Sequence, residues 1–94
     1  MGAYMRIGFI GAGKMAEAIM AALLESKVAA AHEVFASDIS AERRQLLKTR
    51  YGINLYSKNA VIPGSAETLV LAVKPQQMDA VLKELAPRIT SEHL

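Results

Sequence analysis

The chain has 94 residues, a formal net charge of +2 and no cysteine, and 52% of its residues are hydrophobic. This length allows one small domain, and the lack of cysteine excludes disulfides, thiol catalysis and cysteine-based zinc sites. The 11 basic and 9 acidic residues are interspersed and only 5% of residues are aromatic, which disfavours a nucleic-acid-binding module. No apolar run approaches the roughly 18 residues of a membrane helix, and no signal-peptide pattern opens the chain. We therefore expect a cytoplasmic protein that binds neither nucleic acid nor membrane.

Two elements are predicted near the start of the chain. A strand over Arg6–Ile10 is almost continuously apolar, which is typical of a parallel strand buried on both faces. A helix follows over Gly13–Glu25, where apolar residues recur at helical spacing. We expect its core-facing residues to be Met15, Ile19, Ala22 and Leu23.

A second strand and a second helix follow a loop over residues 27–32. The strand is predicted over Glu33–Ser37 and the helix over Ala41–Tyr51. Ser40 is a favourable N-cap, and Gly52 suits the left-handed residue that ends a helix. The residues of this helix expected to face inward are Leu46 and Leu47.

Two further strands and a helix are predicted in the second half of the chain. A short strand covers Ile53–Tyr56, a loop with room for one helical turn covers Ser57–Ala66, and a strand covers Thr68–Val73. Pro75 suits the first position of a helix that runs to Leu85. The apolar stripe of that helix is expected to consist of Met78, Val81, Leu82 and Leu85.

The order of these elements predicts the topology. Strands that alternate with helices form a parallel sheet with helices on both faces, and right-handed crossovers favour the strand order 3-2-1-4. The predicted fold class is therefore α/β, with a doubly wound sheet of the Rossmann type, and one NAD(P)-binding domain spans residues 1–94. Ligands of such sheets bind at the carboxyl ends of the strands where the order reverses, which here lies next to residues 11–15 and 73–75.

The turn between the first strand and its helix is rich in small residues, reading Gly8-Phe9-Ile10-Gly11-Ala12-Gly13-Lys14-Met15-Ala16. In that context Gly11 makes the tight turn, Gly13 lets a pyrophosphate approach the backbone, and Ala16 allows the helix to pack closely on the strand. Unpaired amides at the helix start and the helix dipole favour an anion there. The pattern predicts a dinucleotide-binding loop, and the alternative is a turn of the same shape that binds nothing.

Two motifs together carry a family resemblance. The small-residue motif extended to Ile19, and Leu71-Ala72-Val73-Lys74-Pro75-Gln76 further along, resemble pyrroline-5-carboxylate reductase over nearly the whole chain. The resemblance implies reduction of the C=N bond of 1-pyrroline-5-carboxylate to L-proline, the last step of proline biosynthesis, with NADP(H) or NAD(H). It also implies that the chain is the N-terminal cofactor domain of a longer, homo-oligomeric enzyme whose helical second domain carries the substrate pocket. The isolated chain is then expected to be inactive, and no catalytic residue is assigned in it.

The pattern and the resemblance together predict a set of cofactor-binding residues. They are Ile10, Gly11, Ala12, Gly13, Lys14, Met15, Asp38, Asn59, Ala72, Val73, Lys74 and Pro75. The resemblance implies that Asn59 touches the adenosine side of the cofactor and that residues 72–75 lie next to the nicotinamide ribose. For Lys14, Asn59 and Lys74 an ordinary solvated role remains the alternative. No metal site is predicted, and His32 and His93 are expected at the surface.

Asp38 follows the second strand and bears on the choice of cofactor. A carboxylate at this position accepts both ribose hydroxyls of NAD and repels the 2′-phosphate of NADP. Ser37, Ser40, Arg43 and Arg44 can instead hold a phosphate if Asp38 turns away, and Asp38 can also serve only to begin the next helix. The choice between NADH and NADPH therefore stays open.

Two other functions also stay open. Another imine or keto reductase, or a reductase of the F420 type, can share this domain, and a substrate panel on a full-length enzyme separates these cases. A nucleotide-sensing module without catalysis can use the same loop, and turnover in the presence of a downstream region excludes it.

Overall fold

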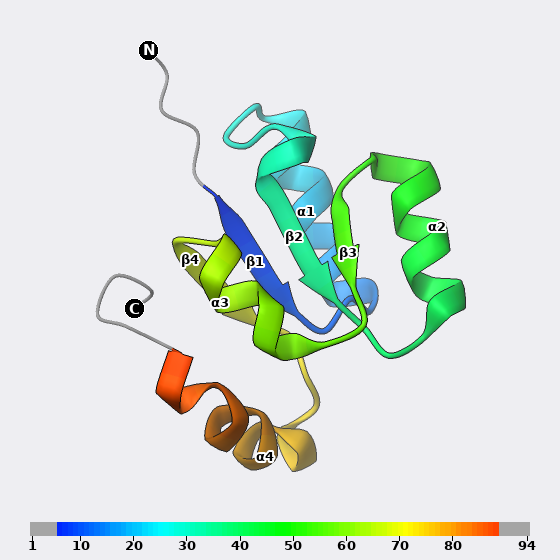
Figure 1. Cartoon of the computed structure of the whole chain (residues 1–94). Coiled ribbons are helices and arrows are strands. Elements are labelled where there is room, and N and C mark those ends of the chain that lie inside the picture. The colour runs from blue at the N-terminus through cyan, green and yellow to red at the C-terminus, as the bar shows by residue number, and fades with distance from the viewer. Residues whose placement is uncertain (1–5, 89–94) are drawn as a thin grey trace.

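A computed structural model describes residues 6–88, which form one sheet with helices on both faces (Figure 1). The strands are β1 (Ile7–Ile10), β2 (Val34–Ser37), β3 (Asn54–Tyr56) and β4 (Thr68–Leu71). The helices are α1 (Lys14–Glu25), α2 (Ala41–Tyr51), α3 (Ile62–Ser65) and α4 (Pro75–Leu85), and 3-10 turns cover Ala31–Glu33, Asn59–Val61 and Ala86–Arg88. None of the helices within residues 6–88 combines the length and the apolar character that crossing a bilayer requires.

The strand order confirms the predicted Rossmann-type topology. The strands lie in the order β3-β2-β1-β4, and all neighbouring pairs are parallel. Ile7 of β1 pairs with Val34 of β2 on one side and with Thr68 of β4 on the other. The order reverses between β1 and β4, so the paired strand ends at Ile10 and Leu71 open on one crevice.

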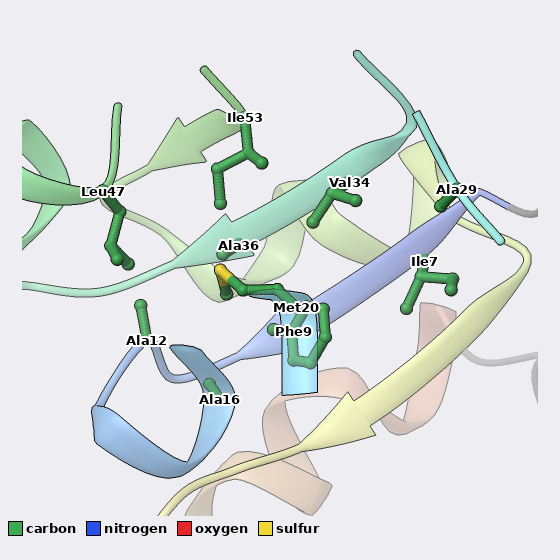
Figure 2. Close-up of a cluster of buried hydrophobic side chains, with 10 residues drawn as sticks. All are labelled: Ile7, Phe9, Ala12, Ala16, Met20, Ala29, Val34, Ala36, Leu47 and Ile53. Carbon is green, nitrogen blue, oxygen red and sulfur yellow. The ribbon is translucent and has the colours of Figure 1, made fainter. Parts of the chain in front are cut away.

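Two apolar clusters hold the helices to the sheet, one on each face. Figure 2 shows the first cluster, which packs α1 and α2 against the sheet and consists of Ile7, Phe9, Ala12, Ala16, Met20, Ala29, Val34, Ala36, Leu47 and Ile53. The second cluster joins Ile10 to Ile62 of α3 and to Val81 and Leu85 of α4. Successive strand residues point to opposite faces, so Phe9 enters the first cluster and Ile10 the second. β1 is therefore buried on both faces, as its apolar sequence predicts.

Gly8, in the middle of β1, allows α3 to approach the sheet. A Cβ atom at this position would overlap the Ile62 side chain and lie 2.9 Å from the Cβ of Ala66. This glycine therefore serves the packing of the fold and not a ligand.

The predicted core face of α1 is wrong for three of its four residues. Its buried residues are Ala16 and Met20, with Leu23 packed beside them. Ala22 is exposed, as are Met15 (66%) and Ile19 (38%). The short side chain of Ala16 brings the helix close to the sheet, and residues one turn apart share a face, so Met20 follows Ala16 inward and the larger residues beside it remain outside.

The apolar stripes of the two later helices are predicted only in part. In α2, Leu47 is buried as predicted, but Leu46 is exposed. In α4, Val81 and Leu85 are buried as predicted. Leu82 is exposed and Met78 is half-buried, although both were predicted to belong to the apolar stripe. Each helix covers one face of a small sheet, so only the residues on its central line become fully buried.

Element boundaries differ from the prediction by one or two residues. β4 ends at Leu71, although the Ala72 amide still donates to the Ile10 carbonyl at 2.9 Å. β2 and β3 each begin one residue later than predicted, at Val34 and Asn54, and the predicted loop at 57–66 contains α3.

The predicted signals at helix ends are confirmed. The Ser40 hydroxyl accepts a hydrogen bond from the Arg43 amide at 3.1 Å, Gly52 ends α2 with φ 72°, and Pro75 begins α4. His32 is exposed as predicted, and His93 lies outside the described residues.

Candidate functional site

The crevice at the carboxyl ends of β1, β2 and β4 holds a pocket of about 540 Å³, within the range of roughly 300–1,000 Å³ typical of small-molecule sites. Eight of the predicted cofactor residues line it: Gly11, Ala12, Gly13, Asp38, Asn59, Ala72, Val73 and Lys74. The other four, which do not line it, are Ile10, Lys14, Met15 and Pro75. The Ile10 side chain is buried in the second cluster, and those of the other three are exposed. Lining residues outside the predicted set are Ser37, Ile39, Gln76, Gln77, Ala80 and Val81.

A smaller depression of about 320 Å³ lies at the other end of α1, lined by residues 29–31, Leu24, Lys27 and Tyr51. It contains none of the predicted cofactor residues and is not at the strand ends where the sheet order reverses. The larger pocket is therefore the candidate site.

The two glycines of the loop have different structural roles. Gly11 has φ 98°, and a Cβ atom there would lie 2.8 Å from the Ala72 carbonyl oxygen. Its backbone conformation and the neighbouring strand end require glycine whether or not a ligand binds. Gly13 has φ −77°, and a Cβ atom there would meet no atom within 4 Å. The fold thus tolerates a side chain at Gly13, and the space beside it is available to a ligand.

The start of α1 presents unpaired amides beside this space. Gly13 is the N-cap residue, no side chain caps the helix, and its first internal hydrogen bond runs from the Glu17 amide to the Gly13 carbonyl at 2.9 Å. The first N–H groups of a helix have no partner within it, and the helix dipole adds partial positive charge there. The start of this 12-residue helix at the pocket can therefore hold an anion such as a phosphate.

Asp38 lines the pocket next to the loop. Its Oδ2 accepts a hydrogen bond from the Ala12 amide at 3.2 Å, and its Oδ1 accepts one from the Ser40 amide at 2.9 Å. An ionised carboxylate offers about four acceptor positions, so these two amides leave room for ribose hydroxyls. The two predicted roles of Asp38, in beginning α2 and in holding a ribose, are geometrically compatible.

Arg43 and Arg44 are both hydrogen-bonded to main-chain carbonyls. Arg43 Nε donates to the Ala12 carbonyl and Nη2 to Glu17 Oε1, each at 2.6 Å. Arg44 Nη1 donates to the Asp38 carbonyl at 2.7 Å. Neither arginine lines the pocket, so the structure does not place them as the phosphate ligands considered from the sequence.

Glu17 joins the start of α1 to α2. Its carboxylate accepts hydrogen bonds from Arg43, from Arg50 at 2.5 Å and from the Tyr51 hydroxyl at 2.7 Å. These hydrogen bonds, that of Tyr51 first, lower the pKa of Glu17 from 4.5 to about 2. The carboxylate in turn raises the pKa of both Arg50 and Tyr51. Glu17 is therefore ionised at neutral pH and ties the two helices together.

Ser37 and Asn59 form a second polar contact at the pocket. The buried Ser37 hydroxyl donates to Asn59 Oδ1 at 2.6 Å, and Asn59 Nδ2 donates to Glu84 Oε1 at 3.3 Å. These contacts orient the Asn59 carboxamide at the pocket wall. They also use the Ser37 proton, so Ser37 does not donate to a phosphate in this arrangement.

The opposite side of the pocket is formed by the turn from β4 into α4. Ala72 and Val73 are half-buried and Lys74 is exposed. The Lys74 amide donates to Gln77 Oε1 at 3.4 Å, and the Gln77 amide donates to the Lys74 carbonyl at 2.9 Å. These local hydrogen bonds close the first turn of α4 and keep Lys74 at the pocket.

The roles of Glu17 and of the Ser37–Asn59 pair are not visible in the sequence motifs. Both contacts join residues that are far apart along the chain, 26 positions for Glu17 and Arg43 and 22 for Ser37 and Asn59. A single sequence shows an acidic residue in the first turn of the first helix and basic residues in the second. No spacing rule tells which of them pair across two elements.

Comparison with known proteins shows the family to which the chain belongs. A family model described as NADP oxidoreductase, coenzyme F420-dependent, matches residues 6–94. The chain belongs to this family. Its curated relatives include the pyrroline-5-carboxylate reductases of Methanosarcina acetivorans and Pseudomonas aeruginosa, which are 40% and 42% identical over 89 residues. Each match covers 95% of this chain but only 33% and 32% of the relative, so the chain spans about a third of their length.

A solved structure supports the same conclusion. The structure of a pyrroline-5-carboxylate reductase from Coxiella burnetii matches with a TM-score of 0.87 and 27% identity, over 95% of this chain and 33% of that one. The fold predicted from the sequence and the resemblance to the cofactor domain of this group of reductases are both confirmed.

Proposed function

We propose that this chain is the cofactor-binding domain of a pyrroline-5-carboxylate reductase, which reduces the C=N bond of 1-pyrroline-5-carboxylate to L-proline with a nicotinamide cofactor. The names of relatives about 40% identical support the reaction, and the name of the family model supports the cofactor class. One observation on the chain itself carries the proposal. At Gly13 a helix begins without a side-chain cap, beside open space, in the pocket of about 540 Å³ at the strand ends.

The residues around the pocket fit a dinucleotide in one orientation. The start of α1 would hold the pyrophosphate, as anions bind at helix N-termini. Asp38 and Asn59 would border the adenosine, and residues 72–75 would border the nicotinamide ribose, because the pyrophosphate lies between the two halves at the point where the strand order reverses.

The part played by this chain is to bind and orient. When bound, the dihydronicotinamide supplies the hydride that reduces the imine carbon. Hydrogen bonds to Asp38 and Arg43 hold the loop in place before a ligand arrives, which lowers the ordering cost of binding. We assign no side chain within residues 6–88 to protonation of the imine nitrogen.

Binding by the chain itself is the first test. Calorimetric titration with NADPH, NADH and ADP-ribose in parallel should show saturable binding of at least one dinucleotide and of ADP-ribose. No binding of any of the three by the folded chain would overturn the proposal.

Turnover is the second test, because binding alone does not separate an enzyme domain from a nucleotide-sensing module. This chain would replace the matching third of the Pseudomonas aeruginosa reductase. We expect the chimera to oxidise NADH or NADPH in the presence of 1-pyrroline-5-carboxylate and to restore growth of a proline auxotroph, and the same chimera with Gly13→Glu to do neither. A folded chimera that binds cofactor without turnover would favour the sensing module.

The other reductases considered from the sequence are not favoured, because the matched relatives carry the name pyrroline-5-carboxylate reductase. Homo-oligomerisation of the full-length enzyme and a cytoplasmic location remain predictions.

A further inference from the structure

Two side chains hold one residue of the cofactor loop from outside it. The Ala12 amide donates to Asp38 Oδ2 at 3.2 Å, and the Ala12 carbonyl accepts from Arg43 Nε at 2.6 Å. Asp38 follows β2, and Arg43 lies in the first turn of α2. The segment that borders the proposed adenosine end of the pocket therefore also holds the loop proposed to bind the pyrophosphate.

The contacts of Arg43 use the edge of its guanidinium that best binds a phosphate. Nε and Nη2 lie on the same side of the planar group, where two parallel N–H bonds can reach two oxygens of one anion. In the structure Nε is bound to the Ala12 carbonyl and Nη2 to Glu17 Oε1. The arginine is thus beside the loop, but this edge is not available to a ligand.

Glu17 is the group that keeps Arg43 in this position. The side chains of Glu17 and Arg43 are only 14% and 20% exposed, so their ion pair is screened less by salt than a surface pair. Glu17 is itself held by Arg50 and Tyr51. The second nearby arginine, Arg44, is directed to the Asp38 carbonyl.

We propose that Glu17 determines which cofactor this site selects. By holding Arg43 against the Ala12 carbonyl, Glu17 leaves Asp38 as the charged side chain that lines the adenosine side of the pocket. A carboxylate there accepts ribose hydroxyls and repels a 2′-phosphate. The site then selects NADH over NADPH, although the family model is named for NADP. Glu17 acts through Arg43 and is a positioning residue, and the inference rests on the proposed function.

The test uses two probes that differ only at the ribose 2′ position, ADP-ribose and 2′-phospho-ADP-ribose, titrated calorimetrically into the 94-residue chain. We expect the wild-type chain to bind ADP-ribose more tightly. Glu17→Gln removes the charge that holds Arg43, and we expect it to shift the ratio of the two dissociation constants by roughly tenfold toward the phosphorylated probe. Glu25→Gln is the matched control, because it removes the same charge from an exposed residue at the other end of α1, and it should leave the ratio unchanged.

A double variant separates release of Arg43 from a general change in charge or packing. Glu17→Gln combined with Arg43→Gln should lose the gain in affinity for 2′-phospho-ADP-ribose. A gain that persists in the double variant would overturn the role of Arg43. Equal weakening of both probes by Glu17→Gln would show that Glu17 only supports the fold.

The two proposals fail in different ways. If the folded wild-type chain binds neither probe, the proposed function is overturned and this inference with it. If both probes bind and Glu17→Gln leaves their ratio unchanged, or if the wild-type chain prefers the phosphorylated probe, only the inference is overturned.

Discussion

The two sides of the pocket are built differently. On the β2–α2 side, hydrogen bonds between elements fix the polar side chains. Asp38 accepts from the loop, Arg43 donates to the loop and to Glu17, and Ser37 donates to Asn59. On the β4–α4 side, the lining is small or apolar apart from Lys74 and two glutamines, and the hydrogen bonds of Lys74 and Gln77 stay within the first turn of α4.

This difference indicates how the chain divides its task. A side held by bonds between elements is preorganised, which favours selective recognition of one ligand shape. A side with few fixed polar groups contributes contact area and little discrimination. We infer that residues 6–88 select the nucleotide half of the cofactor more strictly than the nicotinamide half. The relatives are about three times as long as this chain.

The largest effect is expected for a substitution at the start of α1, which lies between the two sides of the pocket. Gly13→Glu places a side chain and a negative charge in the open space at the start of α1, where the pyrophosphate is proposed to bind. We expect affinity for NADH and for ADP-ribose to fall at least about tenfold, equivalent to about 1.4 kcal/mol or more. Fluorescence and calorimetric titration measure the loss, and circular dichroism should show an intact fold. Unchanged affinity for both ligands would contradict the proposed site.

Gly11 provides the contrasting variant. Gly11→Ala forces a side chain into a left-handed conformation and against the Ala72 carbonyl, which should cost about 1–3 kcal/mol of the free energy of unfolding. Gly13→Ala should cost less than about 1 kcal/mol, since alanine is only a poorer N-cap than glycine. Denaturant titration of the two variants thus separates a glycine required by the fold from one left open for a ligand.

Substitution of Asp38 tests the role assigned to the β2–α2 side. Asp38→Ser removes the carboxylate beside the proposed ribose position, and we expect it to shift the ratio of NADH and NADPH affinities by roughly tenfold toward NADPH. Asp38→Asn is the control for lost hydrogen bonds, because its carboxamide oxygen can still accept from the Ala12 or the Ser40 amide without a charge. Equal ratios before and after Asp38→Ser would remove Asp38 from ribose recognition.

The difference between local contacts and contacts between distant elements also explains which features could be predicted from the sequence. The strand order and the position of Gly11 and Gly13 follow from local patterns, namely periodic apolar runs and a glycine turn between a strand and a helix. The face of α1 does not, because whether Met15 or Met20 points inward depends on how closely Ala16 lets the helix approach the sheet. Apolar periodicity shows that a helix is amphipathic but determines the direction of the buried face only to within about one residue.

The site shows the same limit. Asp38 could be predicted beside the loop because the length of a strand and its crossover set where β2 ends. That Arg43 turns toward the Ala12 carbonyl and away from the pocket could not, since it depends on Glu17 in another helix. Arginines close to a ribose position therefore indicate a phosphate site only when their partners are known.

A further prediction concerns pH and the hydrogen bonds of Glu17 behind the β2–α2 side. The hydrogen bonds to Glu17 lower its pKa from 4.5 to about 2 in the folded chain, so the ionised form stabilises the fold. This contribution is present above about pH 4.5 and declines as the pH falls toward 2. The difference in free energy of unfolding between the wild-type chain and Glu17→Gln should therefore shrink over that interval. Urea denaturation at a series of pH values measures it, and a constant difference would contradict the role of the Glu17 carboxylate.

The smallest expected effect tests the β4–α4 side. Lys74 is exposed and lines the pocket, and exposed charges of this kind contribute up to about 1 kcal/mol. Lys74→Ala should therefore weaken NADH binding by about two- to fivefold and leave ADP-ribose, which lacks the nicotinamide, unaffected. Lys83→Ala, at an exposed position in the last turn of α4, is the matched control and should change neither. If Lys74→Ala weakened the affinities for NADH and ADP-ribose equally, Lys74 would contact the nucleotide half of the cofactor. That result would contradict the proposed difference between the two sides of the pocket. No change in either would identify Lys74 as a solvated residue, the alternative that its sequence position allows.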